Sequence, residues 1–92
     1  MPDSIDQALV RRCSEGDRKA LAAAVQLYLP SLMRYARSHC EGELAANEIV
    51  LRAIERAGRD LRSCAEATSV LAWLLHSVHL ACSSVHRPSP AR

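Results

Sequence analysis

The chain has 92 residues, of which 49% are hydrophobic and 3% are aromatic, and its formal net charge is +2. A chain of this length forms one domain with one modest core, and because it has no Phe that core depends on Leu, Val, Ile and Ala. The charge is too small to indicate a nucleic-acid partner by itself. Residues 1–7 lack the basic and apolar regions of a secretory signal, which favours a cytoplasmic protein.

The chain contains four cysteines, Cys13, Cys40, Cys64 and Cys82, at wide and irregular spacing. No Cys-x-x-Cys pair is present, so neither a zinc ribbon nor a thioredoxin-like motif is predicted, and we expect reduced thiols. The sequence also lacks a glycine-rich phosphate loop and the short signatures of metalloproteases and serine hydrolases. We therefore expect no enzyme activity, no catalytic residue, no cofactor and no metal site.

Glycines at positions 16, 42 and 58 divide the chain, because Gly is favoured just past helix C-termini. Alternating runs typical of β-strands are absent, so the sequence predicts an all-α fold, a compact bundle of four helices. The predicted helices cover residues 4–15, 17–41, 43–57 and 68–86, with a loop over residues 59–67. The bundle forms one domain, residues 1–87, followed by a Pro-containing tail, residues 88–92, that we expect to be disordered.

The second and fourth predicted helices begin at side chains suited to capping, Asp17 and Thr68. Pro30 falls inside the second helix, where it removes one backbone hydrogen bond. The apolar residues continue at steps of three or four on both sides of this proline. We therefore expect a kink, and a break near Leu29 is the alternative.

The third predicted helix has two unlike faces. Its core face consists of Ala46, Ile49, Val50, Ala53 and Ala57. At about 100° per residue, Leu44 and Leu51 lie nearly opposite this face, beside Glu48. A stripe of exposed leucines among polar residues can mark a surface for a partner, although single surface leucines are common and need no explanation.

The fourth predicted helix contains no Asp, Glu, Lys or Arg. Three His and several Ser interrupt its apolar run, so we do not expect it to span a membrane. Its core face consists of Val70, Leu71, Leu74, Leu75, Val78, Cys82 and Val85. Its outer face carries His76, His79, Ser83 and His86. His76 and His79 lie one turn apart, but no further ligand is evident, so we expect solvated histidines.

Three stretches, in this order, resemble region two of extracytoplasmic-function (ECF) sigma factors. They read GDRKALAAAVQLYLPSLMRYARSHC, ELAANEIVLRAIERA and AWLLHSVHLA. The first is similar to the opening helices of that family, the second to the helix that grips RNA polymerase, and the third to the start of the helix that melts the promoter. The resemblance implies the sigma-region-two fold and a role in transcription initiation.

The resemblance also implies which residues face each partner. The set implied for RNA polymerase core is Leu44, Asn47, Glu48, Leu51 and Arg52. The set implied for promoter DNA is Arg59, Arg62, Trp73, His76, His79 and Arg87. Of these, Trp73 is expected to have a structural role before any role in DNA binding. The loop at residues 59–67 occupies the position where these sigma factors hold an extruded base.

The departures from the family pattern are concentrated on the DNA side. His76 and His79 stand where the family usually has basic residues, and Leu80 stands where Asn is common. Neutral imidazoles give little long-range attraction to phosphates, so we expect weak promoter binding that strengthens as the pH falls. The first interpretation is a domain that binds RNA polymerase core and contributes to recognition of the −10 promoter element. The alternative is a sigma mimic that binds an anti-sigma factor or another protein without binding DNA.

Overall fold

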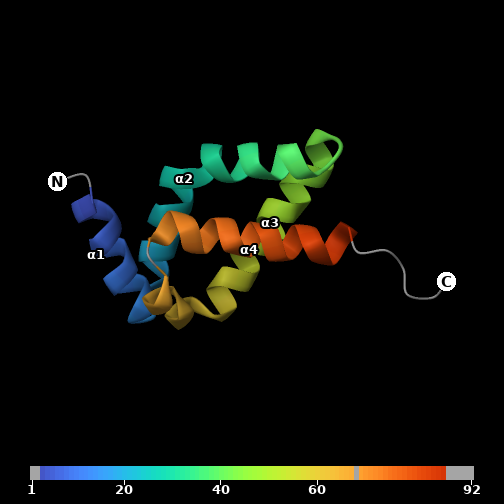
Figure 1. The fold of residues 1–92 in the computed structure, drawn as a ribbon. Coiled ribbons are helices and arrows are strands. Elements are labelled where there is room, and N and C mark those ends of the chain that lie inside the picture. Colours follow the sequence, from blue (N-terminus) through green and yellow to red (C-terminus); the bar gives the residue numbers. More distant parts are fainter. Residues whose placement is uncertain (1–2, 68, 87–92) are drawn as a thin grey trace.

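The computed structural model describes residues 3–67 and 69–86, and within them it contains helices and no strand (Figure 1). The elements are α1 (Asp3–Ser14), α2 (Arg18–His39), α3 (Glu43–Arg59), the 3₁₀ helix η1 (Leu61–Glu66) and α4 (Val70–His86). The all-α prediction is confirmed. The predicted tail, residues 88–92, lies outside the described residues. No helix in the described part of the chain has both the length and the apolar character needed to cross a membrane.

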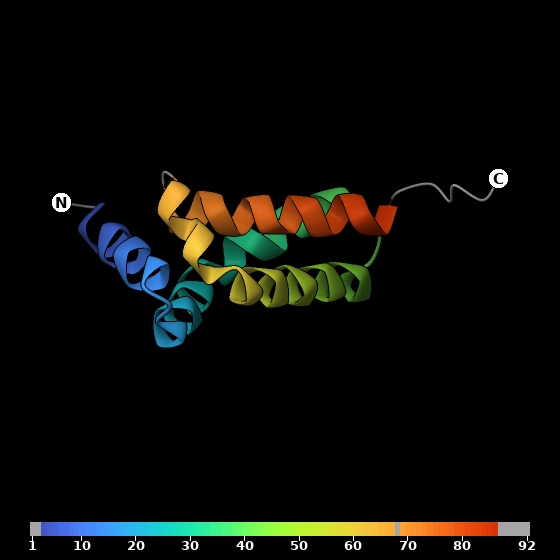
Figure 2. The same ribbon diagram turned by 90° about the horizontal axis from the view of Figure 1, so that it is seen from below.

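The helices α2, α3 and α4 pack against one another, and α1 packs against η1 at one end of them. Figure 2 shows α4 running alongside α3, with α1 at the end opposite to the C-terminus of α4. The segment η1 thus connects α3 to α4 and packs against α1. It is the part of the fold that positions the candidate site.

The segment at residues 59–67 is not the loop expected from the sequence, because it contains the six-residue helix η1. Asp60 accepts two hydrogen bonds from Ser63 at its backbone oxygen, one from the amide at 3.1 Å and one from the hydroxyl at 2.7 Å. Leu61 and Cys64 are buried beside them. Burial of one side chain every third residue matches the 3₁₀ period, and it holds the segment in this form.

The start of α4 also differs from the prediction, since the helix begins at Val70. The hydroxyl of Ser69 accepts from the amide of Ala72 at 3.0 Å, which is the hydrogen bond of an N-cap residue. Thr68, the predicted cap, lies outside the described residues. The predicted cap of α2 is confirmed, because the Asp17 carboxylate accepts from the amides of Lys19 and Ala20.

Helix α2 runs unbroken through Pro30, so the alternative of a break near Leu29 is wrong. In Figure 1 the two halves of this helix run in different directions, as expected for a proline kink. The apolar residues on both sides of Pro30 face the same core, and Leu21 and Leu32 are both buried. Their burial stabilises the helix against the loss of one backbone hydrogen bond.

The core is built mainly from aliphatic side chains and Ala, as the composition predicts. All five residues of the predicted core face of α3 are buried: Ala46, Ile49, Val50, Ala53 and Ala57. On α4, Val70, Leu74, Val78 and Cys82 are buried, and Leu71 and Leu75 are half-buried. Nothing is described for the side chain of Val85.

The thiols of Cys13 on α1 and Cys64 on η1 meet in this core, where both are fully buried. Burial raises the pKa of Cys13, and it raises the pKa of Cys64 to about 11. All four cysteines are free thiols. The Cys13 and Cys64 side chains are therefore neutral at physiological pH and act as small apolar groups in the core.

One carboxylate joins three helices. Asp6 on α1 accepts a hydrogen bond from the Tyr28 hydroxyl on α2 at 2.7 Å, and its second oxygen accepts from the Val70 amide on α4 at 3.1 Å. Burial, the hydrogen bond to Asp6 and its negative charge together raise the pKa of Tyr28 from 10.0 to about 12. The neutral phenol is thus the form that the folded protein favours.

This network predicts a late ionisation of Tyr28. Because the folded-state pKa lies above the unfolded value, the contribution of Tyr28 to stability is present below pH 10 and is lost as the pH rises towards 12. A spectrophotometric titration in a Tyr35→Phe background isolates Tyr28. Asp6→Asn removes the negative charge and should lower the observed pKa. Ionisation of Tyr28 near pH 10 while the helical circular dichroism signal is intact would contradict this assignment.

Candidate functional site

The outer face of α3 presents a stripe of apolar and polar side chains. Leu44 is 85% exposed and Leu51 is 62% exposed, in contrast to the buried alanines on the opposite face. Asn47, Glu48 and Arg52 are also exposed. The five residues implied for RNA polymerase therefore share one surface, which we call the α3 outer face: Leu44, Asn47, Glu48, Leu51 and Arg52.

The charges on the α3 outer face pair with each other. The Arg52 guanidinium lies 3.1 Å from the Glu48 carboxylate, one helical turn away, and both side chains are more than half exposed. Such a pair contributes only about 0.3–0.5 kcal/mol to an exposed helix. Either group can therefore exchange this contact for one with a partner at little cost.

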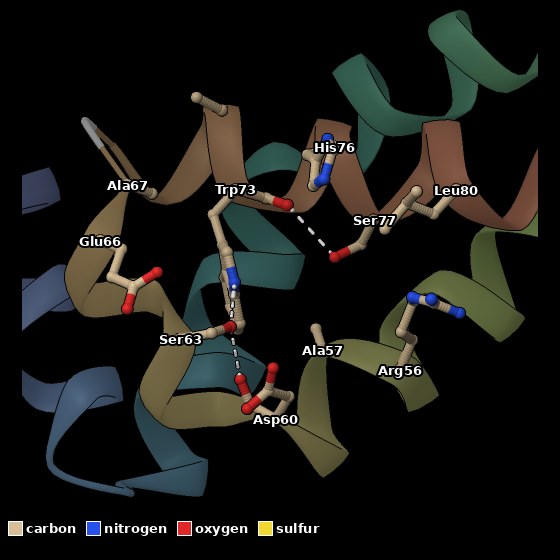
Figure 3. Close-up of a pocket in the computed structure, with 11 residues that line it drawn as sticks. Arg56, Ala57, Asp60, Ser63, Glu66, Ala67, Trp73, His76, Ser77 and Leu80 are labelled. Carbon is tan, nitrogen blue, oxygen red and sulfur yellow. Dashed lines mark hydrogen bonds between the residues drawn. The ribbon is translucent and has the colours of Figure 1, made fainter.

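A pocket of about 620 Å³ opens between the end of α3, η1 and the first half of α4 (Figure 3). It is lined by Arg56, Ala57, Asp60, Ser63, Glu66, Ala67, Ala72, Trp73, His76, Ser77 and Leu80. We call it the α4 pocket. It lies at the segment where the resemblance to ECF sigma factors implies the site of an extruded base.

Trp73 forms a wall of the α4 pocket. Its indole reaches from α4 across to η1, where Nε1 donates to the Ser63 hydroxyl at 3.0 Å (Figure 3). The side chain is only 8% exposed. Trp73 is one of the residues implied for DNA, but its burial and its hydrogen bond to Ser63 support a structural role in packing α4 against η1.

The charges around the α4 pocket are mixed. Arg56 lines it from α3 and His76 from α4, whereas Asp60 and Glu66 contribute carboxylates. Arg56 was not among the residues implied by the resemblance. The sequence feature that could have identified Arg56 is its position one turn after Arg52 on an amphipathic helix. The pocket therefore offers hydrogen-bonding groups, but its basic and acidic side chains together do not produce a strong positive field.

Two of the three predicted surface histidines, His76 and His79, make different contacts. His76 lines the α4 pocket, whereas Nδ1 of His79 lies 3.2 Å from the Tyr35 hydroxyl of α2. The ring centres of His76 and His79 are 6.4 Å apart. Tyr35 also stacks on His39, with ring centres 4.4 Å apart. Within the described residues no three His, Cys, Asp or Glu side chains are grouped to hold a metal ion.

The arginines implied for DNA do not line the α4 pocket in the described part of the chain. Arg59 and Arg62 line a smaller pocket with Gly16 and Arg18, rather than the α4 pocket. Arg87 lies outside the described residues, and so do the contacts of the His86 side chain. The structure thus brings the polymerase set onto one face but separates the DNA set, since Trp73 and His76 line the α4 pocket, Arg59 and Arg62 line the smaller one, and His79 lines neither.

Comparisons of the chain with protein-family models, curated proteins and solved structures found no match.

The contact between Trp73 and Ser63 predicts the effect of Ser63→Ala. The substitution leaves the indole N–H without its acceptor and should destabilise the fold by about 1 kcal/mol or more. Ser38→Ala is the matched control, because the Ser38 hydroxyl bonds an exposed backbone oxygen, and it should change stability by less than about 0.5 kcal/mol. Denaturant unfolding followed by fluorescence of Trp73, the single Trp, measures both. Equal effects of the two variants would contradict the structural role.

Proposed function

We propose that this chain is a sigma-region-two-like domain that binds RNA polymerase core through the α3 outer face and contributes to recognition of the −10 promoter element. The observation that carries the proposal is the exposure of Leu44 and Leu51 on one rigid helix, at 85% and 62%. These positions coincide with those that the motif resemblance assigns to polymerase. The proposed activity takes place in the cytoplasm.

The α3 outer face has the composition of a protein-binding surface. Apolar side chains fill the centre of typical interfaces, and polar and charged groups surround them. Here two leucines supply the apolar part, and Asn47, Glu48 and Arg52 supply the polar part. Because the opposite face of α3 is buried in the core, the backbone that carries these side chains is fixed before binding.

The α4 pocket supports the second half of the proposal. An extruded base needs a hollow with hydrogen-bonding groups for its edge and an apolar surface for its ring. Arg56, Asp60 and Ser77 supply polar groups, and Trp73 and Leu80 supply apolar surface. The two carboxylates at this pocket oppose DNA phosphates, so its contribution to affinity is small.

The proposal predicts that the α3 outer face determines binding to polymerase. The intact chain should be captured by purified RNA polymerase core, and Leu44→Ala with Leu51→Ala should weaken binding by at least about tenfold, since each truncation removes apolar contact area. Leu27→Ala is the matched control, because Leu27 is 53% exposed on α2. Size-exclusion chromatography and biolayer interferometry measure these affinities.

Two outcomes would contradict the proposal. One is the absence of any complex with core polymerase at low salt. The other is an equal effect of Leu27→Ala and of the double variant, since that would place the contact away from α3.

A second candidate is a sigma mimic that binds an anti-sigma factor and does not bind DNA. The absence of charged side chains over residues 67–86 favours it, because a DNA-binding helix is expected to carry fixed cations. The same α3 outer face then serves a protein partner only.

Single-stranded promoter DNA distinguishes the two candidates. If His76 and His79 contact phosphates, affinity should increase as the pH falls from 8 to 6, because protonated imidazoles add positive charge. His76→Gln with His79→Gln should remove this pH dependence, and His39→Gln is the control on α2. Fluorescence anisotropy measures binding. No binding at either pH, together with tight binding to an anti-sigma factor, would favour the mimic.

A further inference from the structure

A second pocket, of about 210 Å³, lies at the turn between α1 and α2, next to the end of α3 and the start of η1. It is lined by Gly16, Arg18, Arg59, Asp60, Leu61 and Arg62. Three arginines and one aspartate thus line one hollow. The arginines come from three different elements, so this concentration of positive charge is a product of the fold.

Arg18 is held in place by the end of α3. Its Nη1 donates to the backbone oxygen of Gly58 at 3.1 Å. A Cβ added at the buried Gly58 would lie 3.1 Å from Nη2 of Arg18, which is closer than side chains usually approach. The glycine thus allows the guanidinium to reach the helix terminus, where a cation is favoured by the helix dipole.

Arg62 reaches the same turn from η1. Its Nη2 lies 3.8 Å from the position that a Cβ at Gly16 would take. Gly16 has a φ of 88°, a conformation that favours glycine. Gly16 has no side chain to cover the backbone at the turn, and the head of Arg62 lies beside it.

These cations are not neutralised by ion pairs with the carboxylates that the structure describes. The ion pairs among the described side chains join Arg12 to Asp17, Arg37 to Glu43 and Arg52 to Glu48. Asp17, next to Arg18 in the chain, is thus engaged by Arg12, and it also accepts from two amides of α2. Asp60 is the carboxylate that lines the pocket.

We propose that this pocket binds a phosphate group, held by Arg18, Arg59 and Arg62. Guanidinium groups match phosphate oxygens with two parallel hydrogen bonds, and the positive charges of the three arginines attract an anion. Arg18 was not among the residues implied for DNA, and the site is separate from the histidines. The phosphate belongs either to a free phosphate ion or monoester, or to a single DNA strand. The DNA source rests on the proposed function, whereas the phosphate site itself does not.

Titration of the ¹⁵N-labelled chain with inorganic phosphate, at constant ionic strength in chloride, tests the site. The amides of Gly16 and Gly58 should shift in a saturable manner. Arg62→Gln should weaken this binding about tenfold, because it removes a charged hydrogen-bond donor. Arg34→Gln is the control, since it removes the same charge from an exposed position on α2 and should leave the binding unchanged.

A short single-stranded DNA, followed by fluorescence anisotropy at several salt concentrations, identifies the source of the phosphate. If the DNA backbone occupies the site, Arg62→Gln should reduce the salt dependence of the logarithm of the affinity by about one phosphate contact, and inorganic phosphate should compete. If Arg62→Gln leaves DNA binding unchanged while it weakens phosphate binding, the ligand is a free phosphate or monoester.

The proposal is overturned if neither phosphate nor DNA gives saturable shifts at Gly16 and Gly58. It is also overturned if Arg34→Gln weakens binding as much as Arg62→Gln, because the effect would then follow net charge alone. Arg59→Gln provides a second variant that leaves the Arg18 contact with Gly58 intact. Failure to bind RNA polymerase core would affect the proposed function and not this test.

Discussion

The Asp6 carboxylate is the contact on which the arrangement of the helices depends. It accepts from Tyr28 of α2 and from the amide of Val70, the first residue of α4. The first turn of α4 has no acidic residue of its own, so a side chain from α1 supplies the negative charge that helix N-termini favour. Because α4 begins at this point, Trp73 lies one turn further on and reaches Ser63 of η1. The wall of the α4 pocket thus follows from a carboxylate far away in the sequence.

Small residues on α3 set the spacing of the bundle. Ala46, Ala53 and Ala57 are buried, and they allow α3 to pack closely against its neighbours with few large side chains. In the same way, the absence of a side chain at Gly58 leaves room for the guanidinium of Arg18. A domain of this size has only about 5–15 kcal/mol of net stability, so each of these contacts is a substantial fraction of it. Leu44 and Leu51 remain exposed although their burial would be favourable, which is consistent with a surface that a partner covers.

The sequence predicts those features that depend on local spacing. The core face of α3, the exposure of Leu44 and Leu51, and the Asp17 cap follow from helical periodicity and from the chemistry of one side chain. The 3₁₀ form of residues 61–66 could not be predicted in this way, because it depends on burial of Leu61 and Cys64 against other elements. Arg59 at the end of α3 and Arg62 on η1 line the pocket at the α1–α2 turn, whereas His76 lines the α4 pocket. The motif resemblance assigned these arginines and histidines to one DNA-binding set, and the tertiary fold separates them.

Asp60 connects the two pockets, since it lines both of them. Its backbone amide also ends α3 by donating to the oxygens of Arg56 and Ala57, which fixes the backbone at this residue between the two pockets. A DNA strand with a phosphate at Arg62 would have to pass this carboxylate before a base entered the α4 pocket. Asp60 repels a phosphate at either pocket, so a strand that reaches both pockets meets this repulsion at more than one phosphate, whereas a lone phosphate ion meets it once. On these two proposals, Asp60 weakens the binding of a DNA strand more than that of a single phosphate, so weak DNA binding and a phosphate site are compatible in one domain.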